Sequence, residues 1–130
     1  MSEANVGVVR AALEAWARGE RGLARDAYDP HVVFILPVLD APVSYGLAET
    51  ERAVESWRRT FDEWRVEIDE TIDGGDQVFL IQRQFGKGRE SGVPVEFPNA
   101  GVYTLRGGKI VRVEYFETRE EALQAAGLSE

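Results

Sequence analysis

Three consecutive runs of alternating apolar and polar residues between positions 76 and 117 constrain this chain more than any other feature. They cover Gln77 to Gly86, Val93 to Leu105 and Ile110 to Phe116, and the last two are joined by the turn Arg106-Gly107-Gly108-Lys109. Successive side chains of a strand point to opposite faces of its sheet. The runs therefore predict an antiparallel sheet with one mostly apolar face that helices cover.

The alternation divides the side chains of these runs between two faces. We expect the covered face to carry Phe79, Ile81, Arg83 and Phe85, then Phe97, Asn99, Gly101, Tyr103 and Leu105, then Val111, Val113 and Tyr115. We expect the opposite face to carry Gln82, Gln84, Thr104, Arg112 and Glu114. Arg83 and Asn99 are the polar exceptions on the covered face. A buried charge or amide without partners costs several kcal/mol, so these two residues are predicted to hold a ligand or to be paired internally.

Size and charge limit the class of protein. The chain has 130 residues, which is the size of one domain spanning 1–130. Its net charge of −8 argues against nucleic acid or an anionic membrane as a partner. The apolar stretch from Val6 to Trp16 is interrupted by Arg10 and Glu14, which fits neither a signal peptide nor a membrane span. The absence of cysteine is compatible with a reducing compartment, and we expect a cytoplasmic protein.

The rest of the chain predicts a helix at each end and mixed structure between them. The expected helices cover Glu3 to Arg18, Gly22 to Tyr28, Leu47 to Trp64, and a short segment from the capping box at Thr118 to Gly127. The expected strands cover His31 to Leu36 and Val66 to Ile72, with a loop from Pro37 to Gly46. Helices and strands in this order predict an α+β fold.

The order of these elements and several short motifs resemble the SnoaL-like branch of the NTF2-like superfamily. The resemblance extends from Val8 to Leu128 and is carried by Tyr28-Asp29-Pro30-His31-Val32, by Leu105-Arg106-Gly107-Gly108-Lys109-Ile110-Val111 and by the tail from Arg119 to Leu128. It implies a cone-shaped α+β barrel in which a strongly curved, mostly antiparallel sheet wraps around a long helix. It also implies a largely apolar pocket at the open end of the cone and pairing of two copies into a homodimer.

The chemistries of this superfamily include ketosteroid isomerases, polyketide cyclases, dehydratases and limonene-type epoxide hydrolases, and a shared fold decides none of them. The positions that would carry an isomerase's tyrosine, base and acid are Ala12, Leu36 and Gly101, which are all non-polar. The lack of an acidic side chain at position 101 also weakens the cyclase interpretation. For an epoxide hydrolase, Arg83 is a candidate arginine, but Phe85 stands where its partner acid is expected.

Candidate residues remain for a pocket that holds a small oxygen-bearing molecule. The candidates for catalysis are Arg83, Asn99 and Tyr103, and the set expected to bind a ligand is Trp16, Tyr28, Phe34, Trp57, Arg83, Phe85, Asn99, Tyr103 and Tyr115. Each has a structural alternative. Arg83 could instead form an ion pair with Glu70, Glu96 or Glu117, Asn99 could satisfy a strand backbone, and the aromatic residues could be core.

Two further residues and three hypotheses complete the prediction. His31 starts a strand, and Asp40 lies in a loop from which it could reach the pocket. No metal site and no cofactor are expected, because a lone histidine without cysteines supplies no usual ligand set. The chain is thus either a cofactor-independent isomerase, cyclase, dehydratase or epoxide hydrolase, or a binding protein without chemistry. A third possibility is an interaction surface on the convex sheet face, with Val78, Leu80, Ala100 and Val102.

Overall fold

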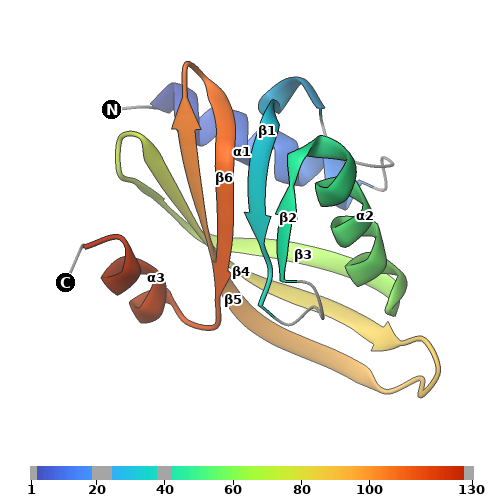
Figure 1. The fold of residues 1–130 in the computed structure, drawn as a ribbon. Coiled ribbons are helices and arrows are strands. Elements are labelled where there is room, and N and C mark those ends of the chain that lie inside the picture. Colours follow the sequence, from blue (N-terminus) through green and yellow to red (C-terminus); the bar gives the residue numbers. More distant parts are fainter. Residues whose placement is uncertain (1–2, 19–24, 38–41, 128–130) are drawn as a thin grey trace.

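The computed structural model describes residues 3–18, 25–37 and 42–127, without the side chains of residues 16 and 17. Three helices and six strands form an α+β domain (Figure 1). The elements are α1 (Glu3–Ala17), the 3-10 turn η1 (Arg25–Ala27), β1 (Tyr28–Ile35), β2 (Val43–Tyr45), α2 (Gly46–Arg59), β3 (Phe61–Asp73), β4 (Gln77–Gly88), β5 (Pro94–Arg106), β6 (Lys109–Phe116) and α3 (Arg119–Ala125). The predicted fold class is confirmed.

The six strands form one strongly curved, open sheet in the order β2-β1-β6-β5-β4-β3. Every pair is antiparallel except β1 with β6, where Tyr28 pairs with Ile110. In Figure 1 the strands β3, β4 and β5 run across the molecule, while β1 and β6 stand nearly upright. The register shifts twice within β3 and once between β5 and β6, and such bulges increase the local twist.

The two faces of the sheet are covered by different helices. Helices α1 and α2 pack on the face that we call the inner face, where Val9, Leu13 and Val54 join the main core. Helix α3 packs on the opposite, outer face and places Leu123 in a smaller core with Phe79. Thr118 is the N-cap of α3, as predicted, and its side-chain oxygen accepts a hydrogen bond from the backbone N–H of Glu121 at 3.1 Å.

The predicted helix from Leu47 to Trp64 is too long. Helix α2 ends at Arg59, and Phe61 and Trp64 belong to β3. Their spacing fits a helical stripe, but strand pairing decides their conformation, because Phe61 lies opposite Gly88 of β4. Periodicity alone cannot distinguish a helix from a bulged strand where the two join.

Two predicted boundaries in the first third of the chain also change. The predicted loop from Pro37 to Gly46 contains the short strand β2, although residues 38–41 lie outside the described part. Strand β1 begins at Tyr28, three residues before the predicted start, and only the turn η1 is described where a second helix was expected. Residues 22–24 of that expected helix are outside the described ranges.

The predicted orientation of β4 is wrong, whereas that of Asn99, Tyr103 and Leu105 in β5 is correct. Gln82 and Gln84 are only 1% and 4% exposed and face inward, while the Arg83 side chain is 38% exposed on the outer face. Val78 and Leu80 are buried in the main core, so they are not part of a convex interaction surface. Other groups cover the outward-facing apolar residues of β4 and β5. Helix α3 packs on Phe79, Ala100 and Val102. The Arg65 guanidinium lies 4.0 Å from the ring centre of Phe85.

Candidate functional site

A narrow cavity lies between the inner face of the sheet and the two helices that cover it. Its described lining residues are Ala12, Leu13, Tyr28, Phe34, Leu36, Val54, Trp57, Gln84, Asn99, Tyr103 and Tyr115. About 40 Å³ of it is open to a water-sized molecule, which is room for a few waters. A ligand as large as one ring therefore enters only if lining side chains move.

Two tyrosines form the polar centre of this cavity. The hydroxyl oxygens of Tyr103 and Tyr115 are 2.8 Å apart and share a hydrogen bond. Gly101 makes room for them, because a Cβ atom there would lie 2.9 Å from the Tyr103 ring and 3.0 Å from the Tyr115 ring. The Phe34 ring contacts Tyr115 edge-on, with 5.8 Å between the ring centres. The non-polar residue at position 101 thus supports the site through its small size.

The tyrosines at the cavity are hydrogen-bond donors rather than bases. Burial raises the pKa of Tyr28 and of Tyr103, and the neighbouring Tyr115 raises both further. Burial also raises the pKa of Tyr115, and the hydrogen bond with Tyr103 offsets part of that increase. All three phenols are consequently protonated at neutral pH.

Two carboxamides complete the polar lining. Gln84 Oε1 accepts hydrogen bonds from Trp57 Nε1 and from Trp64 Nε1, both at 2.9 Å. Asn99 Oδ1 is buried and accepts no hydrogen bond from any described residue. None of the described lining side chains is Asp, Glu, His, Lys or Arg. The described lining is therefore neutral, with phenol and amide groups set among aromatic and aliphatic side chains.

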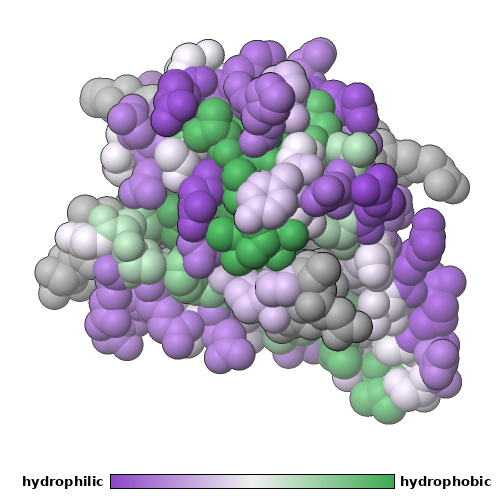
Figure 2. All heavy atoms as spheres, viewed as in Figure 1, coloured by the Kyte–Doolittle hydropathy of each residue, from purple (hydrophilic) through white to green (hydrophobic). Residues whose placement is uncertain are grey.

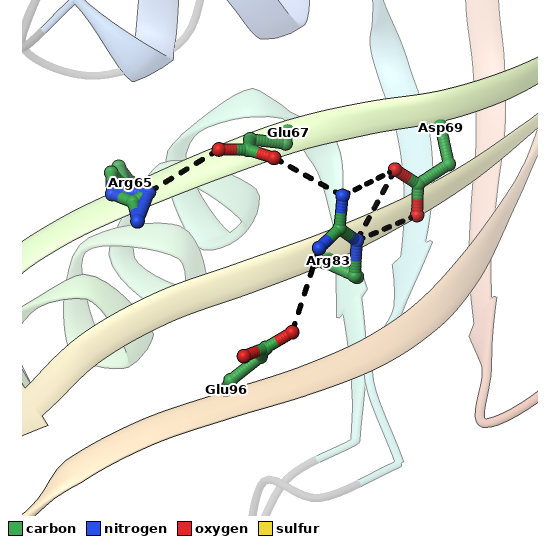
Figure 3. A network of polar contacts seen from close by, with 5 residues as sticks. All are labelled: Arg65, Glu67, Asp69, Arg83 and Glu96. Atoms are coloured by element: carbon green, nitrogen blue, oxygen red, sulfur yellow. Dashed lines mark hydrogen bonds and ion pairs between the residues drawn. The ribbon is translucent and has the colours of Figure 1, made fainter.

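The arginine predicted for the pocket lies on the outer face instead, within a network of carboxylates (Figure 3). Arg83 Nε lies 2.9 and 3.2 Å from the two Asp69 oxygens, and Nη2 donates to Asp69 at 2.9 Å and to Glu67 at 3.1 Å. Nη1 lies 3.5 Å from Glu96 Oε2. The hydrogen bonds from Arg83 lower the pKa of Asp69. Of the alternatives considered for Arg83, the ion pair with Glu96 is observed, and Asp69 and Glu67 are added to it.

The structure brings six of the nine expected ligand-binding residues to the cavity and leaves three elsewhere or undescribed. The six are Tyr28, Phe34, Trp57, Asn99, Tyr103 and Tyr115. Arg83 and Phe85 lie on the outer face, and the side chain of Trp16 is outside the described part. His31 is exposed on β1, and Asp40 is not among the described residues.

Sequence reasoning missed Gln84, because a glutamine flanked by Arg83 and Phe85 was placed on the polar face. A signal was available in β3, where Glu67 and Asp69 alternate with Val66 and Ile68. Placing Val66 and Ile68 inward puts the acids outward, and cross-strand charge pairing then places Arg83 outward with them.

Two classes of feature are not found among the described residues. Within those ranges, no three acidic or histidine side chains gather as metal ligands would. None of the described helices combines the length and apolar character that a membrane span requires.

Comparison with solved structures finds the same fold in several proteins. An NTF2-like protein of unknown function from Burkholderia pseudomallei is 21% identical, with a TM-score of 0.79 over 95% of this chain and 97% of its own. TerC, crystallised with polyporic acid, is 16% identical, with a TM-score of 0.79 over 97% and 98% of the two chains. A hypothetical protein with a ketosteroid isomerase-like fold from Catenulispora acidiphila, in complex with trimethylamine, is 17% identical, with a TM-score of 0.75 over 93% and 92% of the two chains.

Sequence comparison gives the family. No curated protein matches the chain significantly. The model of the SnoaL-like domain matches residues 9–113, which run from the first helix to the last strand of the sheet. The chain therefore belongs to the SnoaL-like domain family.

Proposed function

We propose that this protein binds a small, neutral, mostly hydrophobic molecule that bears oxygen, in the cavity between α1, α2 and the inner face of the sheet. The observation that carries the proposal is the composition of the lining: three protonated phenols and two carboxamides among apolar residues, with no charged side chain in the described set. A charged ligand would lose its hydration there without gaining an opposite charge.

The structural relatives support small-molecule binding without deciding the ligand. Polyporic acid and trimethylamine, named for TerC and for the Catenulispora protein, are chemically unlike each other. The ligand must therefore be inferred from the residues that line this cavity rather than from the shared fold.

Binding without chemistry is favoured over proton-transfer catalysis. Burial raises the pKa of the phenols, so they stay protonated at neutral pH and cannot accept a proton, and the described lining offers no carboxylate or histidine to do so. One observation keeps an enzymatic role as a second candidate. The hydrogen-bonded pair of Tyr103 and Tyr115, with Asn99 nearby, could polarise a carbonyl or stabilise an enolate.

A thermal-shift screen of small phenols, ketones, epoxides and carboxylates tests the proposal. A ligand at about a hundred times its dissociation constant adds about 2.7 kcal/mol to the free energy of unfolding. The neutral oxygen-bearing compounds should raise the unfolding midpoint of the wild type, and the carboxylates should not.

Two variants of α1 locate the binding. Ala12→Leu fills the cavity and should abolish the shift, whereas Ala4→Leu changes an exposed residue of the same helix and should retain it. A shift that persists in Ala12→Leu would place binding elsewhere. No shift with any neutral compound would refute the proposal.

We also propose that two copies pair through the outer face. Figure 2 shows an apolar area in the middle of the viewed face, over β1, β2 and β6, with hydrophilic residues around it. Val43 and Tyr45 of β2 are 36% and 65% exposed and lie opposite Ile35 and Val33 of β1. Exposed aromatic and aliphatic residues of this kind favour an interface. Sedimentation analysis should give twice the chain mass, and a monomer at all concentrations would contradict this.

A further inference from the structure

The orientation of one amide at the cavity is fixed by its partners. An indole N–H can only donate a hydrogen bond, so the two indoles that contact Gln84 require its oxygen to face them. The Gln84 NH₂ group makes no hydrogen bond to another described residue. Gln84 therefore presents a donor to the cavity that it lines.

Two further amides, Gln82 and Asn99, lie directly opposite each other on β4 and β5 and face inward. Gln82 is 1% exposed, and neither its Oε1 nor the Oδ1 of Asn99 accepts a hydrogen bond from the described residues. Opposed side chains of paired strands are close enough to contact one group together. Buried amide oxygens are normally paired, so the Asn99 oxygen, which lies at the cavity, points to a ligand group that donates to it. Gln82 is not among the described lining residues.

The tyrosine pair adds a donor on the same side of the cavity. Of the hydroxyls of Tyr103 and Tyr115, one donates the shared hydrogen bond and the other keeps its proton. Among the described lining residues, the groups left free are thus donors from Gln84 and one tyrosine, and an acceptor from Asn99. The complementary ligand group must both donate and accept.

We propose that the ligand is recognised through a hydroxyl group, as in an alcohol or a phenol, which donates its one proton to Asn99 Oδ1 and accepts from Gln84 or a tyrosine. A ketone, ether or epoxide of the same shape only accepts, and it would leave the Asn99 oxygen without a donor once water is displaced. This inference rests on the proposed function and narrows its ligand class.

Three six-membered ring compounds of similar shape test it: cyclohexanol, cyclohexanone and cyclohexylamine, which is cationic at neutral pH. Their affinities are measured by following the side-chain amide signals in a ¹H–¹⁵N NMR titration. We expect cyclohexanol to bind about tenfold or more tightly than cyclohexanone, and the amine to bind more weakly than the alcohol. The side-chain amide signals of Asn99 should shift with the alcohol.

Two variants give a readout that a purely structural role would not. Asn99→Leu should bring the affinity ratio of alcohol to ketone toward one, whereas Gln82→Met, at a residue outside the described lining, should leave that ratio unchanged. Both variants should also raise the thermal unfolding midpoint, because each removes a buried oxygen without a partner. Gln124→Met, which changes an exposed amide of α3, should alter neither quantity.

The outcomes separate this inference from the proposed function. If cyclohexanol and cyclohexanone bind the wild type equally, the hydroxyl preference is refuted while binding of oxygen-bearing molecules stands. If none of the ring compounds binds and the broader screen also fails, both are refuted. If Asn99→Leu lowers the unfolding midpoint and retains the preference for the alcohol, the amide is a structural group and the inference fails. The wild-type ratio remains decisive even where one variant does not fold.

Discussion

Gln82 and Arg83, consecutive residues of β4, place their polar groups in opposite environments on the two faces of the sheet. On the outer face, Arg83 is a charged group with three carboxylate partners and partial access to water. On the inner face, Gln82 is uncharged, almost fully buried and without a partner for its oxygen among the described residues. A neutral amide can be buried unpaired at a cost far below that of a charge. The comparison teaches that unbalanced hydrogen bonding, rather than charge, marks the face for which we propose ligand binding.

The largest expected effect is that of Gln84→Met on the inner face. The change removes the shared acceptor of the Trp57 and Trp64 indoles and should lower the free energy of unfolding by about 2 kcal/mol or more. Urea denaturation followed by tryptophan fluorescence measures it, with Gln124→Met as the exposed control. A loss below about 0.5 kcal/mol, the range of neutral surface changes, would show that the inner amide is not held by the indoles.

A smaller effect is expected from Tyr28→Phe in alkaline solution. The pKa of Tyr28 is raised in the folded state. The stability that its protonated phenol contributes is therefore fully present below the unfolded pKa of about 10, and it is lost as pH rises toward the folded pKa. Above about pH 10 each such phenol lowers the free energy of unfolding by up to about 1.4 kcal/mol per pH unit. The variant should show a shallower decline with pH. Equal slopes for the two proteins would mean that Tyr28 ionises while the chain is folded.

The smallest effect is expected from Arg83→Met on the outer face, because its ion pairs are partly exposed. Stability should fall slightly at low salt, and the difference should shrink in about 1 M salt, where charges are screened. Since Arg83 lowers the pKa of Asp69, the stability contributed by this ion pair is present above the unfolded pKa of Asp69. It disappears as pH falls through the folded pKa of Asp69.

The affinity for cyclohexanol, measured in variants of the outer face, tests whether only the inner face takes part in binding. It should be unchanged in Arg83→Met, and Arg106→Met, which removes an exposed charge outside the network, serves as the matched control. If Arg83→Met binds cyclohexanol more weakly and Arg106→Met does not, Arg83 takes part in binding and the contrast between the two faces is wrong.

Local sequence patterns were sufficient for the parts of the fold that depend on neighbouring residues. The β5–β6 turn was predictable because Gly107 and Gly108 both adopt positive φ angles, at 60° and 77°. The cap of α3 was predictable from Thr118 and Glu121. The alternation of β5 and β6 also correctly indicated that Asn99, Tyr103 and Tyr115 face inward.

The orientation of β4 was not predictable from its own alternation. Its apolar side faces outward because α3 covers Phe79 and Arg65 covers Phe85, and both partners are distant in the sequence. A rule that assigns the more apolar side of a strand to the inner face fails here, because both faces of this sheet carry an apolar core and the two cores differ in size. Gln84 was missed for the same reason, since its partners Trp57 and Trp64 lie on α2 and β3.

The parallel pairing of β1 with β6 has a consequence for how the chain is made. Tyr28 pairs with Ile110, so at usual rates of translation roughly ten seconds separate the emergence of the two strands from a ribosome. Until then β1 has only the three-residue strand β2 beside it, and its apolar residues have no completed core. The N-terminal third should therefore be the segment on which a chaperone acts during synthesis, and native structure should form only after the last strand has emerged.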